Sequence, residues 1–296
     1  MSNSLAFITC QESNEVNVIN LNSLSVVDVK KVGNSPAAID IDSKKKLIFI
    51  ANPESNDVSV IDLKTNMLDT ISANKTPLGI KFYDKKNKII VSNWYHNMIT
   101  IVDLKSHEKK IISVGKSPAG LDIHPKTGQI VVANRDSDNI SLIDDIDNAV
   151  VSNIKVQKSP FGVFFSENGD IIYVTNVQSN SISIIDTKKK ELIKNIKVKE
   201  WPYQVSESPE KNEIFVSNQR DDSISIIDKQ TLKIKNEIKD VCGYPEGINI
   251  SKKFNLIIIA CWFDNEVVIL DLDSKKVIKK IEVCEGPRSF GKFVID

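Results

Sequence analysis

The chain has 296 residues and carries 39 basic and 39 acidic side chains, so its formal net charge is zero. A neutral chain lacks the strongly basic character that is typical of proteins binding nucleic acid or anionic membranes, and we expect no nucleic-acid partner. No apolar run approaches the roughly 18 residues that a membrane-spanning helix needs, so we expect no membrane span.

Near-copies of one unit of 41 to 43 residues run through the sequence, seven in all. In each copy a short apolar strand ends in a small residue followed by Asn, or by Cys in the outer two copies. These anchors are Cys10, Asn52, Asn93, Asn134, Asn176, Asn218 and Cys261. A proline recurs with the same period, at Pro36, Pro77, Pro118, Pro160, Pro202, Pro245 and Pro287. Regular self-similarity at this period indicates a repeat architecture.

The sequence starts on an apolar strand at residues 5–9, which is the second strand of a unit. The third unit is the example we take, and it predicts strands at residues 79–82, 88–92, 98–102 and 110–114, bounded by turn residues. The second of these is apolar on both faces and must be buried on both. Four-stranded sheets of this kind, repeated around an axis, form a β-propeller. We predict an all-β fold, a seven-bladed β-propeller of four-stranded antiparallel blades, as one domain over residues 1–296.

The last predicted strand, residues 288–295, follows the seventh proline and is the first strand of a unit. Three strands of the first blade then come from the N-terminus and the fourth comes from the C-terminus. This pairing would close the ring and remove an exposed sheet edge.

The tetrapeptide Tyr173-Val-Thr-Asn176, the segment Asn-Ser-Ile-Ser-Ile-Ile-Asp at 180–186 and Ser117-Pro-Ala-Gly120 resemble the repeats of the YVTN-repeat β-propeller family. The resemblance covers the full length and implies the propeller fold. Such relatives include proteins of unknown role, surface-layer components, heavy chains of amine dehydrogenases and lactonase-like enzymes. Many relatives are exported, but the first strand here begins near Leu5 and leaves no room for a signal peptide. We expect a cytoplasmic protein, or a periplasmic or secreted one if a leader has been removed.

Two sets of loops should emerge on one face of the propeller, which we call the top face: the loops after the repeated Asn and the crossovers around the repeated Pro. All three Trp and all three Arg of the chain fall there. Both residue types are enriched at binding hot spots, and the planar guanidinium suits a carboxylate or phosphate. The alternative is that the Trp cap blade ends and the Arg pair with neighbouring acids. The predicted binding residues are Trp94, Tyr95, His96, Arg135, Trp201, Tyr203, Arg220, Glu246, Trp262, Phe263 and Arg288.

The residue after each repeated proline should lie near the mouth of the channel. In order these residues are Ala37, Leu78, Ala119, Phe161, Tyr203, Glu246 and Arg288. Glu246 and Arg288 belong to neighbouring blades and are placed to pair, either as an ordinary interblade ion pair or as part of a ligand site. Further along the same strands, one equivalent position should line the channel; it carries Asp40, Lys81, Asp122 and Asn249.

The four cysteines, Cys10, Cys242, Cys261 and Cys284, all map to the top of blades 6, 7 and 1. Four cysteines in a chain of this length do not indicate a disulfide framework, and no close Cys-x-x-Cys pair indicates zinc. We expect small packed side chains, no metal and no cofactor, with a zinc or redox site as the alternative. His96 is the only histidine expected on the top face.

The sequence favours a non-enzymatic binding or scaffold protein, monomeric, that recognises a protein or an anionic ligand through its top face. A lactonase-like hydrolase would use a channel-mouth site of Glu246, Arg288 and His96, although His96 should lie across the mouth from the other two. A propeller subunit of an oxidoreductase would need a partner that carries the cofactor. Binding of single-stranded nucleic acid, through Trp stacking and Arg contacts, is a fourth alternative that the neutral charge disfavours.

Overall fold

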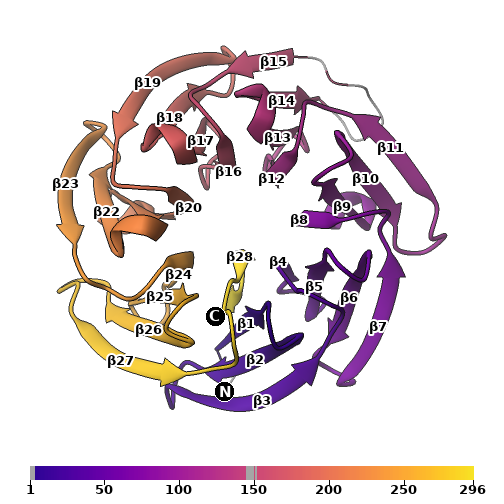
Figure 1. The fold of residues 1–296 in the computed structure, drawn as a ribbon, viewed down its shortest axis with the longest axis horizontal. Coiled ribbons are helices and arrows are strands. Elements are labelled where there is room, and N and C mark those ends of the chain that lie inside the picture. Colours follow the sequence, from indigo (N-terminus) through magenta and orange to yellow (C-terminus); the bar gives the residue numbers. More distant parts are fainter. Residues whose placement is uncertain (1–3, 145–149, 151) are drawn as a thin grey trace.

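The computed structural model describes residues 4–144, 150 and 152–296. Over these residues seven β-sheets stand as blades around a central axis (Figure 1). Strands that follow one another within a blade pair antiparallel. This arrangement confirms the predicted seven-bladed β-propeller of four-stranded blades. In the described ranges no helix combines the length and the apolar character that a membrane span requires.

We number the blades from the N-terminus. Blade 1 contains β1 (Leu5–Cys10), β2 (Glu15–Asn20) and β3 (Ser25–Lys31). Blade 2 contains β4 (Ala38–Asp42), β5 (Leu47–Asn52), β6 (Asp57–Asp62) and β7 (Met67–Ser72). Blade 3 contains β8 (Pro77–Tyr83), β9 (Lys88–Asn93), β10 (Met98–Asp103) and β11 (Lys109–Ser113). Blade 4 contains β12 (Pro118–Ile123), β13 (Ile130–Asn134), β14 (Asn139–Ile143) and β15 (Ser152–Lys155). Blade 5 contains β16 (Pro160–Phe165), β17 (Ile171–Asn176), β18 (Ser181–Asp186) and β19 (Glu191–Lys197). Blade 6 contains β20 (Pro202–Ser208), β21 (Glu213–Asn218), β22 (Ser223–Asp228) and β23 (Lys233–Ile238).

Blade 7 contains β24 (Pro245–Ser251), β25 (Leu256–Cys261), β26 (Glu266–Asp271) and β27 (Val277–Glu282). The C-terminal segment adds β28 (Phe290–Gly291) and β29 (Val294–Ile295). Short 3-10 helices lie in the loops, namely η1 (Asp84–Lys86), η2 (Arg135–Ser137), η3 (Val177–Ser179), η4 (Pro209–Lys211) and η5 (Gln219–Asp221). The four strands predicted for the third unit are found as β8 to β11, with ends that differ by two residues or fewer.

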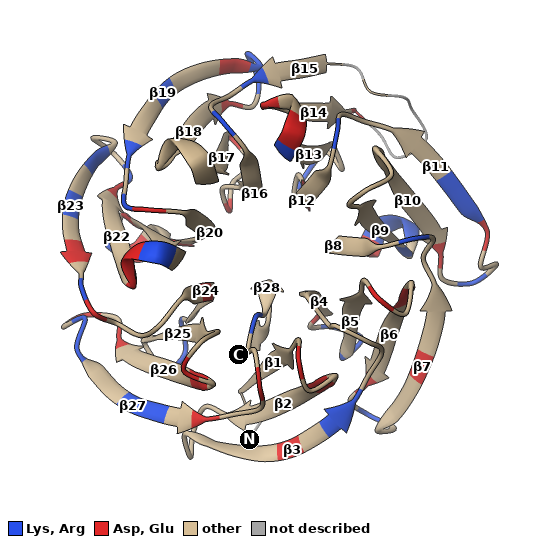
Figure 2. Ribbon diagram, viewed as in Figure 1, with Lys and Arg blue, Asp and Glu red and all other residues tan. Residues whose placement is uncertain are grey.

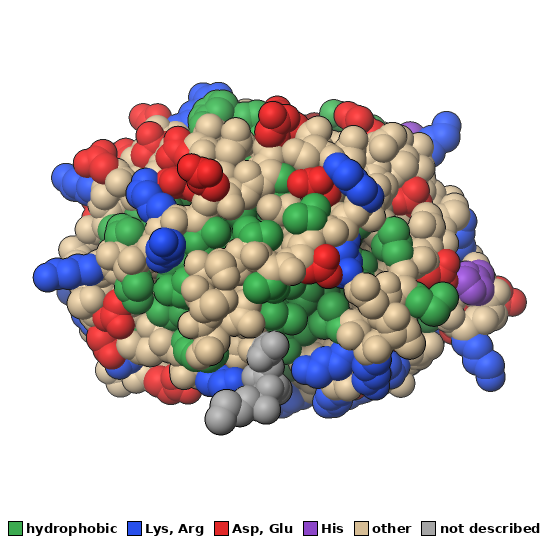
Figure 3. Space-filling view, turned by 90° about the horizontal axis from the view of Figure 1, so that it is seen from below, with side chains coloured by type: hydrophobic (Ala, Val, Ile, Leu, Met, Phe, Trp, Pro, Cys, Tyr) green, Lys and Arg blue, Asp and Glu red, His purple; other side chains and the backbone are tan. Residues whose placement is uncertain are grey.

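The second strand from the axis is buried on both faces, as its unbroken apolar sequence predicts. Every residue of β21 and of β25 is buried, whereas most of the outermost strands β7 and β19 is exposed. The core lies between neighbouring blades: Ile99 of blade 3 and Val132 of blade 4, for example, share one cluster. Figure 3 views the rim beside β3 and β27, where apolar side chains lie between charged ones above and below.

The repeated Asn is buried and fastens the loops around it. Asn134 Nδ2 donates a hydrogen bond to Ser141 Oγ (2.8 Å) in the following strand. Asn93 Nδ2 donates instead to the crossover that enters its blade, at Ala73 O (3.1 Å) and Lys75 O (2.8 Å). A side chain at this position therefore lies within reach of both the following strand and the preceding crossover.

Cysteine replaces this Asn in blades 1 and 7, and there the contact with the crossover is covalent. Cys10 is bonded to Cys284, and Cys261 to Cys242. The expectation that the cysteines do not form disulfides is therefore wrong. The partners are 274 and 19 residues apart in sequence, and the propeller brings each crossover against the second strand of the blade it enters. The disulfides leave none of the four thiols free to bind zinc.

Residues 287–296 close the ring, as predicted, but not as one continuous strand. β29 pairs antiparallel with β1 of blade 1, which confirms the closure. β28 pairs in parallel with β4 of blade 2. β28 ends at Gly291, with φ of +118°, where an added Cβ would approach the carbonyl oxygen of Ile39 to 2.3 Å. Only glycine fits this bend, so the predicted strand is divided into two short ones.

Gln204 of blade 6 holds this C-terminal segment in place, at a position where four other blades carry glycine. Its Nε2 donates to Gly291 O and Ile248 O (both 2.9 Å), and its Oε1 accepts from Gly291 N (2.9 Å). Asn249 of blade 7 accepts from Phe293 N (2.8 Å). Gln204, which replaces the glycine of four other blades, therefore stabilises the C-terminal segment through these hydrogen bonds.

Replacing Gln204 by Ala should destabilise the protein by about 1–3 kcal/mol, because the N–H of Gly291 loses its acceptor, whereas the carbonyls of Gly291 and Ile248 still accept from Asn249 Nδ2. Chemical denaturation measures this loss. Ser206→Ala is the matched control, since it removes a hydroxyl from the same strand. A loss for Gln204→Ala no larger than that of the control would contradict the bracing role.

Candidate functional site

The loops that follow the repeated Asn lie against the crossovers that precede the repeated Pro. The backbone N–H of Arg135 donates to Ser117 O (3.1 Å), and that of Gln219 donates to Trp201 O (2.9 Å). The two loop sets therefore share one face of the propeller, the top face.

The residue before every repeated Pro has a positive φ, which places it in the left-handed region. Small residues occupy most of these positions: Ser35, Thr76, Ser117, Ser159 and Gly286. Trp201 (φ 55°) and Tyr244 (φ 60°) are the exceptions in size. Large side chains rarely adopt this conformation, and backbone strain of this kind gathers at functional sites.

A cavity of about 420 Å³ opens on the top face at the mouth of the channel. Three repeat positions supply most of its wall, namely the residues before and after the Pro and the residue after the Asn. We call it the mouth cavity, and its lining residues are Trp94, Tyr95, Ser117, Arg135, Asp136, Phe161, Val177, Trp201, Tyr203, Gln219, Tyr244, Glu246 and Arg288. Blades 3 to 7 and the C-terminal segment all contribute to it.

Aromatic rings form the inner end of the mouth cavity. Phe161 and Tyr203 stack with ring centroids 4.6 Å apart, and Phe290 of β28 lies 5.4 Å and 5.2 Å from them. Phe290 is only 4% exposed. Another hollow, at the other end of the channel, is lined by residues that include Lys81, Asp122 and Asn249, and it shares no lining residue with the mouth cavity. These rings therefore separate the two ends of the channel.

A second hollow of about 560 Å³ adjoins the mouth cavity. Trp94, Tyr95, Phe161 and Arg288 line both of them. The charged residues that line the second hollow are Glu54 and Arg288.

Each of the three arginines lies over an aromatic ring. The guanidinium carbon of Arg220 is 3.5 Å from the ring centroid of Trp201, and that of Arg135 is 5.8 Å from the centroid of Trp94. Arg288 lies 5.7 Å from the centroid of Tyr203. Stacking holds a guanidinium flat while its edge stays free to donate hydrogen bonds.

The arginines differ in how their charge is balanced. Arg288 Nε lies 3.0 Å from Glu246 Oε2, which confirms that these neighbours pair. Arg135 is 3.0 Å from Asp136 of its own loop. For Arg220 the described part of the chain offers no acidic group within 4.0 Å. Acidic and basic residues are otherwise spread around the whole ring (Figure 2).

Glu246 is buried at the centre of a hydrogen-bonded group. Its Oε1 accepts from Gln219 Nε2 (2.7 Å), while Arg288 donates to Tyr203 Oη (2.9 Å) and to Gln11 Oε1 (2.9 Å). Burial raises the pKa of Glu246 to about 7, and the nearby Arg288 charge and these hydrogen bonds limit the rise. Burial likewise raises the pKa of Tyr203. Glu246 can therefore gain or lose a proton near neutral pH.

The sequence matches a family model described as a YNCE-like beta-propeller over residues 2–171 and 209–296. The chain belongs to the YNCE-like β-propeller family. No curated protein sequence matches it significantly. The family match confirms a β-propeller family, and the narrower resemblance to YVTN-repeat propellers stays a prediction.

Solved structures with this fold share little sequence with this YNCE-like propeller. Hydrazine synthase from Kuenenia stuttgartiensis superposes with a TM-score of 0.80 at 19% identity, covering 90% of this chain and 91% of that chain. A functionally unknown protein from Desulfotomaculum acetoxidans DSM 771 gives 0.81 at 13%, covering 98% and 100%. Dihydro-heme d1 dehydrogenase NirN in complex with DHE gives 0.75 at 13%, covering 96% and 74%. At these identities the likeness shows the fold alone.

Seven of the predicted binding residues of this YNCE-like propeller line the mouth cavity: Trp94, Tyr95, Arg135, Trp201, Tyr203, Glu246 and Arg288. Arg220 stacks on Trp201 beside it. Trp262 and Phe263 pack 4.9 Å apart next to Tyr244, outside the cavity lining.

His96 is exposed and is not among the residues that line the mouth cavity. The structure therefore brings Glu246 and Arg288 together without His96. The hydrolase alternative loses its only expected acid–base histidine at this place.

Sequence reasoning missed Gln11 and Gln219, which bind the Arg288–Glu246 pair, and Val177 of the cavity wall. All three follow the repeated Asn or its Cys substitute directly. The residue after the Asn recurs once in every blade, as the residue after the Pro does, so a comparison of all seven copies at this position would have identified these three residues.

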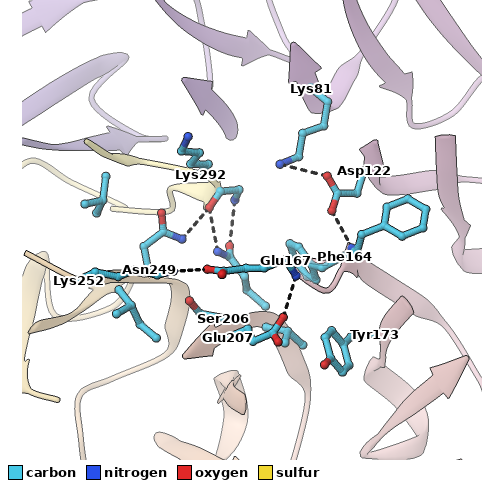
Figure 4. Close-up of a pocket in the computed structure, with 16 residues that line it drawn as sticks. Lys81, Asp122, Phe164, Glu167, Tyr173, Ser206, Glu207, Asn249, Lys252 and Lys292 are labelled. Atoms are coloured by element: carbon cyan, nitrogen blue, oxygen red, sulfur yellow. Dashed lines mark hydrogen bonds and ion pairs between the residues drawn. The ribbon is translucent and has the colours of Figure 1, made fainter. Parts of the chain in front are cut away.

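Three of the predicted channel residues, Lys81, Asp122 and Asn249, line a hollow at the opposite end of the channel (Figure 4). Lys81 Nζ lies 3.3 Å from Asp122 and 3.6 Å from Asp40. Burial opposes the charge of Lys81, but the two carboxylates outweigh it and raise its pKa. Asp40 and Asp122 also accept from the backbone N–H of Phe82 and Phe165 in the next blade (2.8 Å each). These residues join adjacent blades, which is a structural role.

Proposed function

We propose that this protein is a non-enzymatic binding propeller that holds a small, flat, anionic ligand in the mouth cavity. The observation that carries the proposal is the cavity of about 420 Å³ with aromatic walls, where each nearby arginine lies over a ring. Cavities of this size suit small molecules. Aromatic faces favour a flat apolar body, and guanidinium edges favour a carboxylate, sulfonate or phosphate.

The backbone of Trp201 and Tyr244 supports this proposal. Both hold a large ring at a left-handed position where the other blades carry Ser, Thr or Gly. Such a conformation costs on the order of 1–3 kcal/mol. Both rings line the mouth cavity, so the two crossovers that depart from the repeat in this way place their large side chains at the ligand space.

Titration with naphthalene-2-sulfonate, followed by quenching of tryptophan fluorescence, tests the proposal. We expect Arg220→Ala to weaken binding about tenfold, because a hydrogen bond to a charged group contributes about 1.5–3 kcal/mol. Trp201→Asn should weaken it at least as much, since Asn tolerates the left-handed backbone but lacks the ring. Lys252→Ala, at the other end of the channel, is the control. Equal affinities for all four proteins would contradict the proposal.

Attachment of a protein partner to the same face is a related possibility, because Tyr95 and Phe263 are 71% and 64% exposed. Capture from the native lysate with wild type and the Arg135/Arg220/Arg288→Ala variant separates the two. A protein retained by the wild type alone would favour a partner, and a retained metabolite would favour the ligand.

The paired cysteines support residence in an oxidising compartment, since structural disulfides persist there and are rare in the cytosol. Alkylation of the protein directly on lysis of its native source, followed by mass measurement, tests this. Four unmodified cysteines would agree with it, and four alkylated cysteines would contradict it.

A second candidate is a propeller subunit of an oxidoreductase. Hydrazine synthase and the NirN dehydrogenase, which share the fold, support it. Such a subunit would copurify with a redox partner from the native source, and isolation of the protein alone would count against it. Lactone hydrolysis that is lost on Glu246→Gln would instead favour the lactonase alternative.

A further inference from the structure

Glu246 is the counter-ion of an arginine that faces the ligand space. Glu246 as a whole residue is 3% exposed, and its Oε2 lies 3.0 Å from Arg288 Nε. The other partners of Arg288, Tyr203 and Gln11, are hydrogen-bonding groups without charge at neutral pH. In the described residues Glu246 is therefore the only carboxylate within ion-pair distance of Arg288.

The other charges at the mouth cavity come from Arg135 and Asp136 of its lining and from Arg220 beside it. Arg135 is balanced by Asp136, 3.0 Å away. With Glu246 ionised, the lining residues carry two positive and two negative charges, and Arg220, which stacks on Trp201 beside the cavity, adds one further positive charge. Protonation of Glu246 raises the positive charge by one, at Arg288. The adjoining hollow contains Glu54, which repels an anion from that side.

We infer that Glu246 determines ligand specificity: the mouth cavity takes a flat anion beside Arg288, and Glu246 accepts one proton from solvent as the anion binds. This inference rests on the proposed binding function and deepens it. The ligand's charge replaces that of Glu246 as the partner of Arg288, and no covalent bond of the ligand changes. A neutral ligand gains nothing from the exchange.

The surroundings of Glu246 allow this proton uptake. Burial raises its pKa to about 7, so a modest change in its partner suffices to protonate it. The groups that face it are Arg288 from the C-terminal segment, Tyr203 from β20 and Gln219 from η5. Burial raises the pKa of Tyr203, so none of these three titrates between pH 6 and 8.

The test uses naphthalene-2-sulfonate, whose sulfonate stays ionised from pH 6 to 8. If the anion binds only the protonated form of a group with a pKa near 7, affinity should fall about tenfold from pH 6 to pH 8. Calorimetry in two buffers with different heats of ionisation should show proton uptake on binding. Naphthalene-2-sulfonamide, which is uncharged, is the control ligand and should bind independently of pH.

Glu246→Gln is the matched variant, because it keeps the shape of the side chain and removes its charge. Its affinity for the sulfonate should be independent of pH and at least equal to that of the wild type at pH 6. The melting temperature of the variant checks that it is folded, and proton uptake by the wild type tests the inference without any variant.

Wild-type binding that is independent of pH and takes up no proton would overturn this inference while leaving the proposed function intact. The same holds if Glu246→Gln keeps the wild-type pH dependence. Failure of the sulfonate to bind at either pH, or binding unchanged by Trp201→Asn, would overturn the proposed function itself.

Discussion

Removal of residues 287–296 should unfold the whole ring and not merely its last strand. Four side chains of this segment are buried apolar groups, Phe290, Phe293, Val294 and Ile295. Full burial of each contributes about 1.5–3 kcal/mol, so the segment accounts for roughly 6–12 kcal/mol. A typical protein is stable by about 5–15 kcal/mol in total. Thermal and chemical unfolding of the truncated protein measure the loss.

The truncation has an internal control. Lys292→Ala changes an exposed side chain of the same segment, so its melting temperature should stay close to that of the wild type. Addition of a peptide with the sequence of residues 287–296 should restore part of the lost stability, because it can pair with β1 again. A truncated protein that melts at the wild-type temperature would show that this closure contributes little.

Loss of the disulfide between Cys10 and Cys284 should have the next largest effect. It joins the first strand of the chain to the last crossover and encloses 274 residues. A disulfide restricts the unfolded chain more strongly when its loop is longer, by about 3 kcal/mol for a loop of fifteen residues and about 5 kcal/mol for one of a hundred or more. We therefore expect Cys10→Ser/Cys284→Ser to unfold at a clearly lower denaturant concentration than the wild type.

The Cys242–Cys261 disulfide is the matched comparison, because it occupies the equivalent repeat positions but spans 19 residues. Its Ser/Ser variant should lose about 3 kcal/mol. It should also bind naphthalene-2-sulfonate less tightly, since Cys242 lies two residues before Tyr244 of the mouth cavity. If a strong reductant does not change the unfolding of the wild type, the stability losses expected for both disulfides would be contradicted.

The fold could be predicted because each repeated anchor has a physical role that returns in every blade. The buried Asn fastens the loops, as Asn134 does, and the Pro follows a left-handed residue. The break at Gly291 could not be predicted in this way. It depends on contacts with Ile39 and Gln204, which occur at one place in the ring and have no counterpart in the repeat.

The site was predictable in its position more than in its details. Comparison of equivalent positions placed Trp94, Trp201 and Glu246 on the same face, and all three line one cavity. It did not show that Trp94 lines the cavity whereas His96, in the same loop, does not. The direction of each side chain depends on the conformation of the turn, which the repeat pattern does not give. The cysteine pairs were missed because disulfide spacing is usually read along the sequence, whereas Cys10 and Cys284 meet only when the ring closes.

A crystal structure of the protein with naphthalene-2-sulfonate, prepared at pH 6, would locate the bound anion. We expect a single flat molecule in the mouth cavity, with its ring against the aromatic wall and its sulfonate beside Arg288. Binding only at the apolar rim, or only at the end of the channel that contains Lys81, would contradict this expectation.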